Sequence, residues 1–208
     1  PPLATADFAP YLAQITRDAD VVATAIFAAD SLRFVKQYAE YGLKGKIPLA
    51  GKALTLEDAL PSMGDAALGH ISSFHYSTAL DNPVNKRFLA AYAAKYKRTG
   101  TGMSDQGYVG AQMIARALEA VKGNIENQEA FLSALRGIEV DAPRGKLKLD
   151  TFQNPIHTFY IFKVEKREGM LQNIPIASYP NTDQFWKWTP AEFRAMPGYM
   201  EMKGKWAK

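Results

Sequence analysis

The sequence predicts an α/β protein built on a doubly wound parallel sheet. Helical and strand patterns alternate over the first 75 residues, with short connections between them. The strand patterns are continuous apolar runs, which are typical of parallel strands covered on both faces. Together, the alternation and the apolar runs favour an open sheet with helices on both sides.

Three helix and strand pairs make up this alternating region. Strands are expected over residues 20–27, 47–50 and 69–74. The helices are expected to begin at Thr5 or Asp7, at Asp30 or Ser31, and at Thr55. Gly42 is placed to end the second helix, because glycine readily adopts the left-handed conformation found at helix C-termini.

The pattern changes after Phe74 to consecutive helices. They are expected from Asn82-Pro83 to about Arg98, from Ser104 or Asp105 to Gly123, and over residues 127–135. The inward faces are expected to carry Phe88, Leu89, Tyr92 and Tyr96, then Tyr108, Ala111, Ala115 and Leu118, then Phe131, Leu132 and Leu135. The preceding strands do not supply a packing surface for these helices, so we expect the helices to pack on another part of the protein.

In the last part of the chain, strands are expected again, over residues 146–149, 156–164 and 171–179. Residues 156–164 are apolar on both faces, so this strand is expected to be central in the sheet. The tail is expected to be an irregular segment held to the surface by aromatic side chains, namely Phe185, Trp186, Trp188, Phe193, Tyr199 and Trp206.

Composition excludes several classes of function. The 208 residues include no cysteine, so disulfides, thiolate metal sites and cysteine nucleophiles are excluded. No glycine-rich phosphate loop follows a strand, and the three histidines lack metal-ligand spacing, so we expect no cofactor and no metal. The net charge is only +4, and the basic cluster Lys95, Lys97 and Arg98 fits a solvated helix end. Nucleic acid is therefore not an expected partner.

No strong catalytic constellation is present, and we predict no catalytic residue. Ser104 lies in a segment one residue too long for a nucleophile elbow and without a preceding strand, so a helix cap is its expected role. The paired carboxylates of Glu57-Asp58 and of Glu165 and Glu168 lie at a helix start and a hairpin tip, where they are expected to be solvated.

Short loops after the strands are the expected ligand site, because ligands of doubly wound sheets bind at the carboxyl ends of the strands. The candidate residues are Phe27, Ala28 and Asp30 after the first strand, Lys52 and Ala53 after the second, and His75 after the third. Phe27 is suited to stack on a ligand and Lys52 to pair with an anion. The alternative is that Phe27 is a core residue and Lys52 is merely solvated.

Several runs carry a family resemblance, namely Thr5–Leu12, Ala19–Val22, Gln37–Leu43, Gly64–Gly69, Asn82–Phe88, Tyr108–Lys122 and Ala142–Gly145. In order and spacing they resemble the type I periplasmic solute-binding proteins of ABC importers, and more narrowly the leucine/isoleucine/valine-binding branch. The resemblance implies two α/β lobes, joined by three crossover strands, that close on a ligand by a hinge motion.

The resemblance also implies how the chain is divided. Residues 1–75 match second-lobe α/β units, 76–140 match helices of the first lobe, and 141–208 match crossover strands and the aromatic-rich tail of the second lobe. About the front half of the family has no counterpart here. The chain therefore resembles a C-terminal portion, with any signal peptide upstream of Pro1.

The function implied by the resemblance is non-enzymatic and periplasmic. Such a protein binds a small molecule between its lobes and delivers it to an ABC permease in the inner membrane. In amino-acid binders of this family an aromatic residue stands where Phe27 does, and an acidic residue after the next strand receives the ligand's ammonium group. Here that second stretch is Gly51–Ala53, and the cation Lys52 favours a carboxylate. We therefore expect an organic acid, with an aromatic acid favoured over a leucine-type ligand.

Two other classes of function stay open. One is a cytosolic ligand-sensing domain, which an upstream DNA-binding segment would support. The other, less favoured, is a Rossmann-like enzyme, which would place a cofactor or a polar catalytic cluster at the strand ends. If only these residues exist, we expect apolar surface at Tyr92, Tyr108 or Leu118 and association with another chain.

Overall fold

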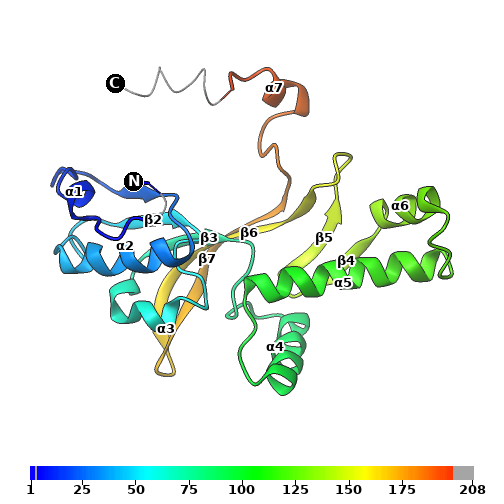
Figure 1. Cartoon of the computed structure of the whole chain (residues 1–208), viewed down its shortest axis with the longest axis horizontal. Helices are drawn as coiled ribbons and strands as arrows, with labels where there is room; N and C mark the ends of the chain where they lie inside the picture. Colours follow the sequence, from blue (N-terminus) through cyan, green and yellow to red (C-terminus); the bar gives the residue numbers. More distant parts are fainter. Residues whose placement is uncertain (3, 199–208) are drawn as a thin grey trace.

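Figure 1 shows the chain as a computed structural model that describes residues 1–2 and 4–198. The strands are β1 (Val22–Thr24), β2 (Leu49–Lys52), β3 (Ile71–Phe74), β4 (Glu139–Ala142), β5 (Gly145–Leu149), β6 (Pro155–Arg167) and β7 (Met170–Thr182). The helices are α1 (Ala9–Leu12), α2 (Ala28–Glu40), α3 (Leu60–Met63), the 3₁₀ turn η1 (Gly64–Ala67), α4 (Pro83–Tyr96), α5 (Gly102–Ala120), α6 (Gln128–Arg136) and α7 (Pro190–Arg194).

The sheet has the order β1-β2-β3-β6-β5-β4, with β7 paired to β6. The first three strands are parallel, with Val22 opposite Leu49 and Ala50 opposite Ile71, which confirms the parallel sheet predicted for this region. Strand β6 is antiparallel to β3 and to β7, so the whole sheet is mixed. Parallel pairing of β1 to β3 brings their carboxyl ends to one edge, where a ligand site was expected.

Apolar side chains of α2 anchor it to the parallel strands. Phe34, Val35 and Tyr38 of this helix are buried in the largest core cluster, together with Phe8 and Leu49. Tyr38 satisfies its hydroxyl inside the core by donating to the carbonyl oxygen of Ile47 at 2.9 Å. The helix is followed by Gly42 at φ +74°, which confirms the predicted left-handed stop.

Strand β6 connects the two ends of the molecule. It pairs with β5 at Pro155 and Ile156, with β3 over residues 160–163, and with β7 along most of its length. Phe162 and Val164 are each 1% exposed, so the predicted central position of this strand is confirmed. Figure 1 shows α1–α3 and β1–β3 gathered at one end of β6, and α4–α6 with β4 and β5 gathered at the other.

The buried face of α5 differs from the predicted one. The structure buries Asp105, Val109, Met113 and Ala117, every fourth residue, whereas Tyr108 is 40% exposed. The predicted Ala111 and Ala115 are also exposed, and Leu118 is only partly buried. The reason is β4, a strand that the sequence did not predict. A second core cluster packs Val109 and Met113 against Val140, Ala142 and Leu147 of β4 and β5.

Other elements differ from the predictions in their bounds or burial. The third helix was expected to begin at Thr55, but Thr55 lies in a turn and α3 begins at Leu60. The first strand was expected over residues 20–27, but β1 covers only three of these eight residues. The face of α6 is less buried than expected, with Leu132 41% exposed. In the tail, Phe185 is buried against Phe152, while Trp186, Trp188 and Phe193 are exposed. The predicted aromatic contacts of Tyr199 and Trp206 lie outside the described residues.

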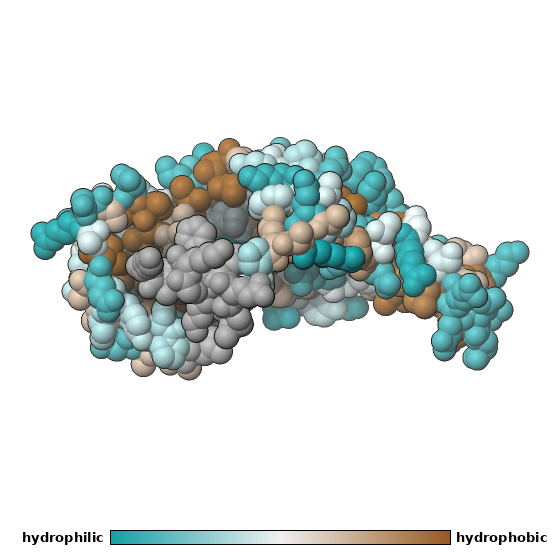
Figure 2. Space-filling model, turned by 90° about the horizontal axis from the view of Figure 1, so that it is seen from above, coloured by the Kyte–Doolittle hydropathy of each residue, from teal (hydrophilic) through white to brown (hydrophobic). Residues whose placement is uncertain are grey.

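Apolar residues remain on the surface at both ends of the molecule, shown in brown in Figure 2. Of the three residues expected to be exposed, Tyr108 is 40% exposed, whereas Tyr92 and Leu118 are partly buried. Within residues 1–2 and 4–198, no helix combines the length and the apolar character needed to cross a bilayer.

Gly51 of β2 is expected to tolerate no side chain. A Cβ atom there would lie 2.5 Å from Thr24 Oγ1 and 3.0 Å from the Thr24 carbonyl oxygen. Because a backbone atom cannot move away easily, we expect Gly51→Ala to lower the free energy of unfolding by about 1–3 kcal/mol in urea denaturation. The control is Gly107→Ala on α5, where the added Cβ meets no atom within 4 Å and helix propensity improves. Equal stability of Gly51→Ala and the wild type would contradict this packing.

Candidate functional site

The loop after β1 presents an aromatic side chain to solvent. Phe27 caps α2 in an extended conformation and is 47% exposed, so the alternative that it belongs to the core is wrong. Ala28 follows in the left-handed region, at φ +53°. A non-glycine residue in that region is uncommon and marks a backbone turn fixed by its surroundings. This turn places Phe27 at the carboxyl end of the parallel strands.

Asp30 is engaged within the chain. Its Oδ2 accepts a hydrogen bond from the Ala4 amide at 2.9 Å, and its Oδ1 forms an ion pair with Arg33. One oxygen therefore binds the N-terminal segment and the other binds Arg33 in the second turn of α2. A ligand contact of Asp30 stays a prediction that would require one of these partners to be shared.

The end of β2 exposes an unpaired cation. Lys52 is exposed, and within residues 1–2 and 4–198 its ammonium group forms no ion pair and no hydrogen bond. Ala53 is buried at φ +49°, and its amide donates to the Ser73 carbonyl oxygen at 2.8 Å, which fixes the turn that follows Lys52. The positive charge of Lys52 is thus available at the same sheet edge as Phe27.

His75 is a buried side chain, only 5% exposed. Its Nε2 lies 3.3 Å from Gln106 Nε2 and 3.9 Å from Asp105 Oδ2, and its ring packs edge-on against His157 at 5.7 Å between centroids. Burial lowers the pKa of His75 to about 3, and the nearby Arg144, His157 and Lys52 disfavour its cation further. The imidazole is therefore neutral at pH 7, and its contact with a ligand stays a prediction.

A buried ion pair lies behind His75 and joins α5 to the turn between β4 and β5. Arg144 Nε is 2.7 Å from Asp105 Oδ2, and both side chains are at most 6% exposed. Burial raises the pKa of Asp105 to about 6 although Arg144 opposes that shift. Oδ1 of Asp105 has no hydrogen-bond partner in the described part of the chain. Tyr160 of β6 donates to the Arg144 carbonyl oxygen at 2.9 Å, so the pair is also tied to the long strand.

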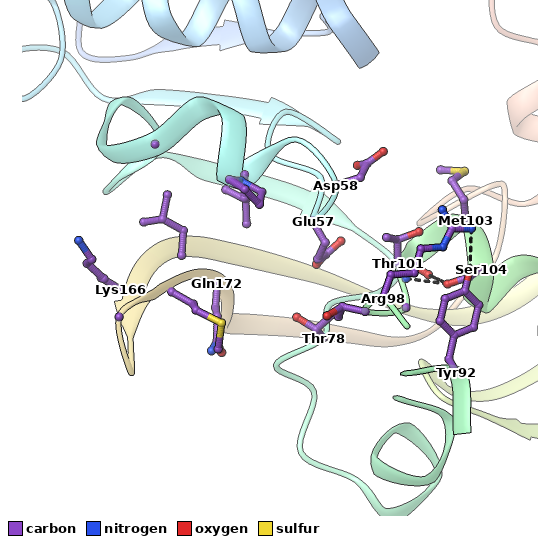
Figure 3. A pocket seen from close by; sticks show the side chains of 18 of the residues that line it. Glu57, Asp58, Thr78, Tyr92, Arg98, Thr101, Met103, Ser104, Lys166 and Gln172 are labelled. Atoms are coloured by element: carbon purple, nitrogen blue, oxygen red, sulfur yellow. Dashed lines mark hydrogen bonds between the residues drawn. The ribbon is translucent and has the colours of Figure 1, made fainter. Parts of the chain in front are cut away.

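A cavity of about 1110 Å³ opens between two groups of elements, as Figure 3 shows. One wall comes from the loop after β2, from α3 and from the β6–β7 hairpin, and the other from the α4–α5 loop and the first turn of α5. The side chains labelled in Figure 3 are Glu57, Asp58, Thr78, Tyr92, Arg98, Thr101, Met103, Ser104, Lys166 and Gln172. The six predicted ligand residues lie outside this lining.

Glu57 departs from its predicted role. It was expected to be solvated, but it lines the cavity, and its Oε1 accepts a hydrogen bond from Asn173 Nδ2 at 3.3 Å. Burial raises the pKa of Glu57 to about 7, and hydrogen bonds to the carboxyl oppose the shift. The only sequence signal for Glu57 was its position shortly after a strand end. Asn173 is 116 residues away, so nothing in the local sequence predicted the contact between the two side chains.

Ser104 has the capping role that was predicted. It accepts from the Thr101 amide at 2.6 Å and donates to the Thr101 carbonyl oxygen at 2.8 Å. In the described residues, the hydrogen bonds of its hydroxyl are both with Thr101. Its hydroxyl also lines the cavity, together with Thr101 and Met103.

Comparisons with known proteins agree with this architecture. The family model described as periplasmic binding protein matches residues 1–169. A curated relative, the Leu/Ile/Val-binding protein homolog 6 of Brucella suis biovar 1, is 32% identical over 186 residues, which is 86% of this chain and 47% of the relative. The chain thus spans about half the length of the curated relatives it matches.

Solved structures give the same result. An ABC transporter substrate-binding protein from Sphaerobacter thermophilus is 36% identical with a TM-score of 0.83, over 88% of this chain and 52% of that one. Two solute-binding proteins of ABC transporters from Rhodopseudomonas palustris, in complex with 3,4-dihydroxybenzoic acid and with 4-hydroxybenzoate, are each 32% identical. Their TM-scores are 0.78 and 0.81, over 89% and 88% of this chain and 51% and 52% of theirs. The chain belongs to the periplasmic binding protein family and has the α/β fold of its type I members.

Proposed function

We propose that this chain forms one wall of the ligand cleft of a periplasmic solute-binding protein that delivers its ligand to an ABC permease in the inner membrane. Family membership supports a binding role, and the matched solved proteins are named as components of ABC transporters. The exposed strand-end residues Phe27 and Lys52 supply a surface for a small molecule.

The ligand that the site favours is a small organic acid with an aromatic ring. The observation that carries this proposal is the unpaired cation of Lys52 at the same sheet edge as the exposed ring of Phe27. A carboxylate binds an ammonium by a charge-assisted hydrogen bond, and an aromatic face stacks on a ring. The benzoic acids in the two matched R. palustris structures carry these two features.

An amino acid is the second candidate ligand. It is favoured by the name of the Brucella relative and by the two carboxylates, Glu57 and Asp58, that follow β2 and line the cavity. Either carboxylate would attract an ammonium group. Lys52 would repel that group, which is why the organic acid is preferred.

We further propose that residues 1–75 and 150–198 form one lobe and that residues 76–149 belong to the other, so the second border lies after β5 and not at residue 140 as the resemblance implied. The separate core clusters around Val35 and around Val109 support a division of this kind. Packing places Glu139–Leu149 beside α5, so the border between the lobes would lie just after β5. Closure of the lobes would then bring the α4–α5 loop toward Glu57 across the cavity.

Calorimetry on the full-length natural protein tests this function. We expect 4-hydroxybenzoate and benzoate to bind with measurable heat and leucine to bind at least about 100-fold more weakly, which corresponds to about 2.7 kcal/mol. Tight binding of leucine without binding of either acid would contradict the organic-acid proposal and favour the second candidate. Binding of neither class would contradict both.

A further inference from the structure

We propose that Ser72 and Thr55 are positioning residues for ligand binding, because they hold the loop after β2 in the conformation that presents Lys52 to a ligand carboxylate. This inference rests on the proposed function, in which Lys52 pairs with the carboxylate of an organic acid. It adds two residues that touch no ligand themselves and act through the backbone next to Lys52.

Ser72 of β3 accepts two hydrogen bonds from the loop after β2. Its side chain is buried, and its Oγ lies 3.1 Å from the amide nitrogen of Leu54 and 3.4 Å from that of Thr55. The amide of Ala53 donates to the carbonyl oxygen of Ser73, the next residue of β3, at 2.8 Å. Three successive amides of the loop are therefore fixed to β3.

Thr55 ties the same loop to β7, which lies beyond β3 and β6 in the sheet. Its Oγ1 donates to Asn173 Oδ1 at 2.8 Å, and Asn173 Nδ2 donates to the Thr55 carbonyl oxygen and to Glu57 Oε1. Ser77 Oγ in turn donates to the Asn173 carbonyl oxygen at 2.7 Å. Thr55, Asn173 and Ser77 are each at most 3% exposed. The loop is thus held at its start by β3 and two residues later by β7.

A buried polar network of this kind specifies a single backbone arrangement. Buried hydroxyl and amide groups are unfavourable unless each finds a partner, so a loop conformation that broke these hydrogen bonds would be disfavoured. Apolar side chains would fill the same space without that restriction, whereas a satisfied polar network rigidifies the segment that it joins. The loop is therefore rigid where it leaves Lys52.

The backbone of Lys52 is fixed on both sides. Before it, Gly51 packs so closely on Thr24 that an added Cβ atom would lie 2.5 Å from Thr24 Oγ1. After it, Ala53 is buried at φ +49°, a conformation that a non-glycine residue keeps only when its surroundings hold it. The Lys52 side chain is long and exposed, so the fold can preset only the direction in which it leaves the backbone. A preset direction reduces the conformational entropy that is lost when a ligand binds.

A double-mutant cycle on the full-length natural protein tests this role, with 4-hydroxybenzoate as the probe in calorimetry. Ser72→Ala and Thr55→Val each remove a hydroxyl of the network and should weaken binding about fivefold. In the Lys52→Met background the same changes should weaken binding less than about twofold, because the group on which they act is gone. Thr55→Ser keeps the hydroxyl and should retain the wild-type affinity.

The matched control is Tyr38→Phe, which removes another buried hydroxyl, the donor to Ile47 before the opposite end of β2. It should lower the urea midpoint, as the two network variants do, and leave affinity unchanged. Amide hydrogen exchange adds a readout that needs no ligand. The Leu54 and Thr55 amides should be protected in the wild type, and Ser72→Ala should speed their exchange by about tenfold.

Several outcomes would overturn the inference. Equal losses of affinity in the wild-type and Lys52→Met backgrounds would show that the network does not act through Lys52. Unchanged affinity in Ser72→Ala and Thr55→Val would exclude a positioning role and leave the proposed function intact. If the wild type bound neither 4-hydroxybenzoate nor benzoate, the proposed function itself would fail, and this inference with it. Should Ser72→Ala fail to fold, Thr55→Val gives the same test with the side-chain volume retained.

Discussion

Replacement of Arg144 by methionine is expected to lower the free energy of unfolding by about 3–5 kcal/mol at pH 7. Methionine retains an apolar stem but removes the charge that lies 2.7 Å from Asp105 Oδ2. Asp105 is fully buried, and its other oxygen has no partner in the described structure. The remaining carboxylate must then stay charged without compensation or take up a proton, and both cost stability. Urea denaturation monitored by circular dichroism measures the effect.

Two further variants show whether the buried pair is the cause. Lys146 lies two residues after Arg144 and forms an exposed ion pair with Glu139. Lys146→Met removes that charge and should leave the denaturation midpoint nearly unchanged. The double variant Asp105→Leu with Arg144→Met should recover most of the lost stability, because an apolar pair replaces the ion pair. A single Arg144→Met variant as stable as the wild type would show that the buried pair is not needed.

Reversal of charge at Lys52 is expected to weaken binding of an aromatic carboxylate by about 100-fold. Lys52→Glu removes a charge-assisted hydrogen bond and places a negative group beside the ligand's own. Lys52→Met removes only the attraction, so a loss of about tenfold is expected. Because Lys52 is exposed and has no ion pair among the residues that the structure describes, neither change should alter the thermal stability of the ligand-free protein. Calorimetry with 4-hydroxybenzoate on the full-length natural protein measures both losses.

The matched control for this prediction is Lys36→Glu, which makes the same change of charge on the exposed face of α2. It separates a local effect from one of net charge and should leave affinity unaltered. Equal affinities of the wild type and Lys52→Glu would show that Lys52 does not contact the ligand.

Much of the fold follows from local sequence, because its signals act over short distances. The apolar runs at β1, β2 and β3 predicted parallel strands, and Gly42 predicted the end of α2. Strand β4 was missed because Glu139–Ala142 carries two charges in four residues and is extended only through pairing with β5. The buried face of α5 lies nearly opposite the predicted one because β4 packs on Val109 and Met113. A face can be predicted only when its packing partner is known.

The site was less predictable than the fold because it depends on contacts between distant segments. Position after a strand identified Phe27 and Lys52, and the structure shows both to be exposed. The same reasoning included His75, which is buried by α5 and β6. Glu57 was dismissed as solvated, since nothing near it in sequence indicates that Asn173 encloses it. Adjacent carboxylates look alike in sequence, and only the packed structure separates Glu57 from the exposed Asp58.

The central claim is that this wall receives the carboxylate of an aromatic acid. A crystal structure of the full-length natural protein with 4-hydroxybenzoate tests it most directly. We predict the carboxylate within hydrogen-bond distance of Lys52 Nζ and the ring against Phe27. A ligand bound between the lobes with its carboxylate turned away from Lys52, or bound elsewhere on the protein, would contradict the account.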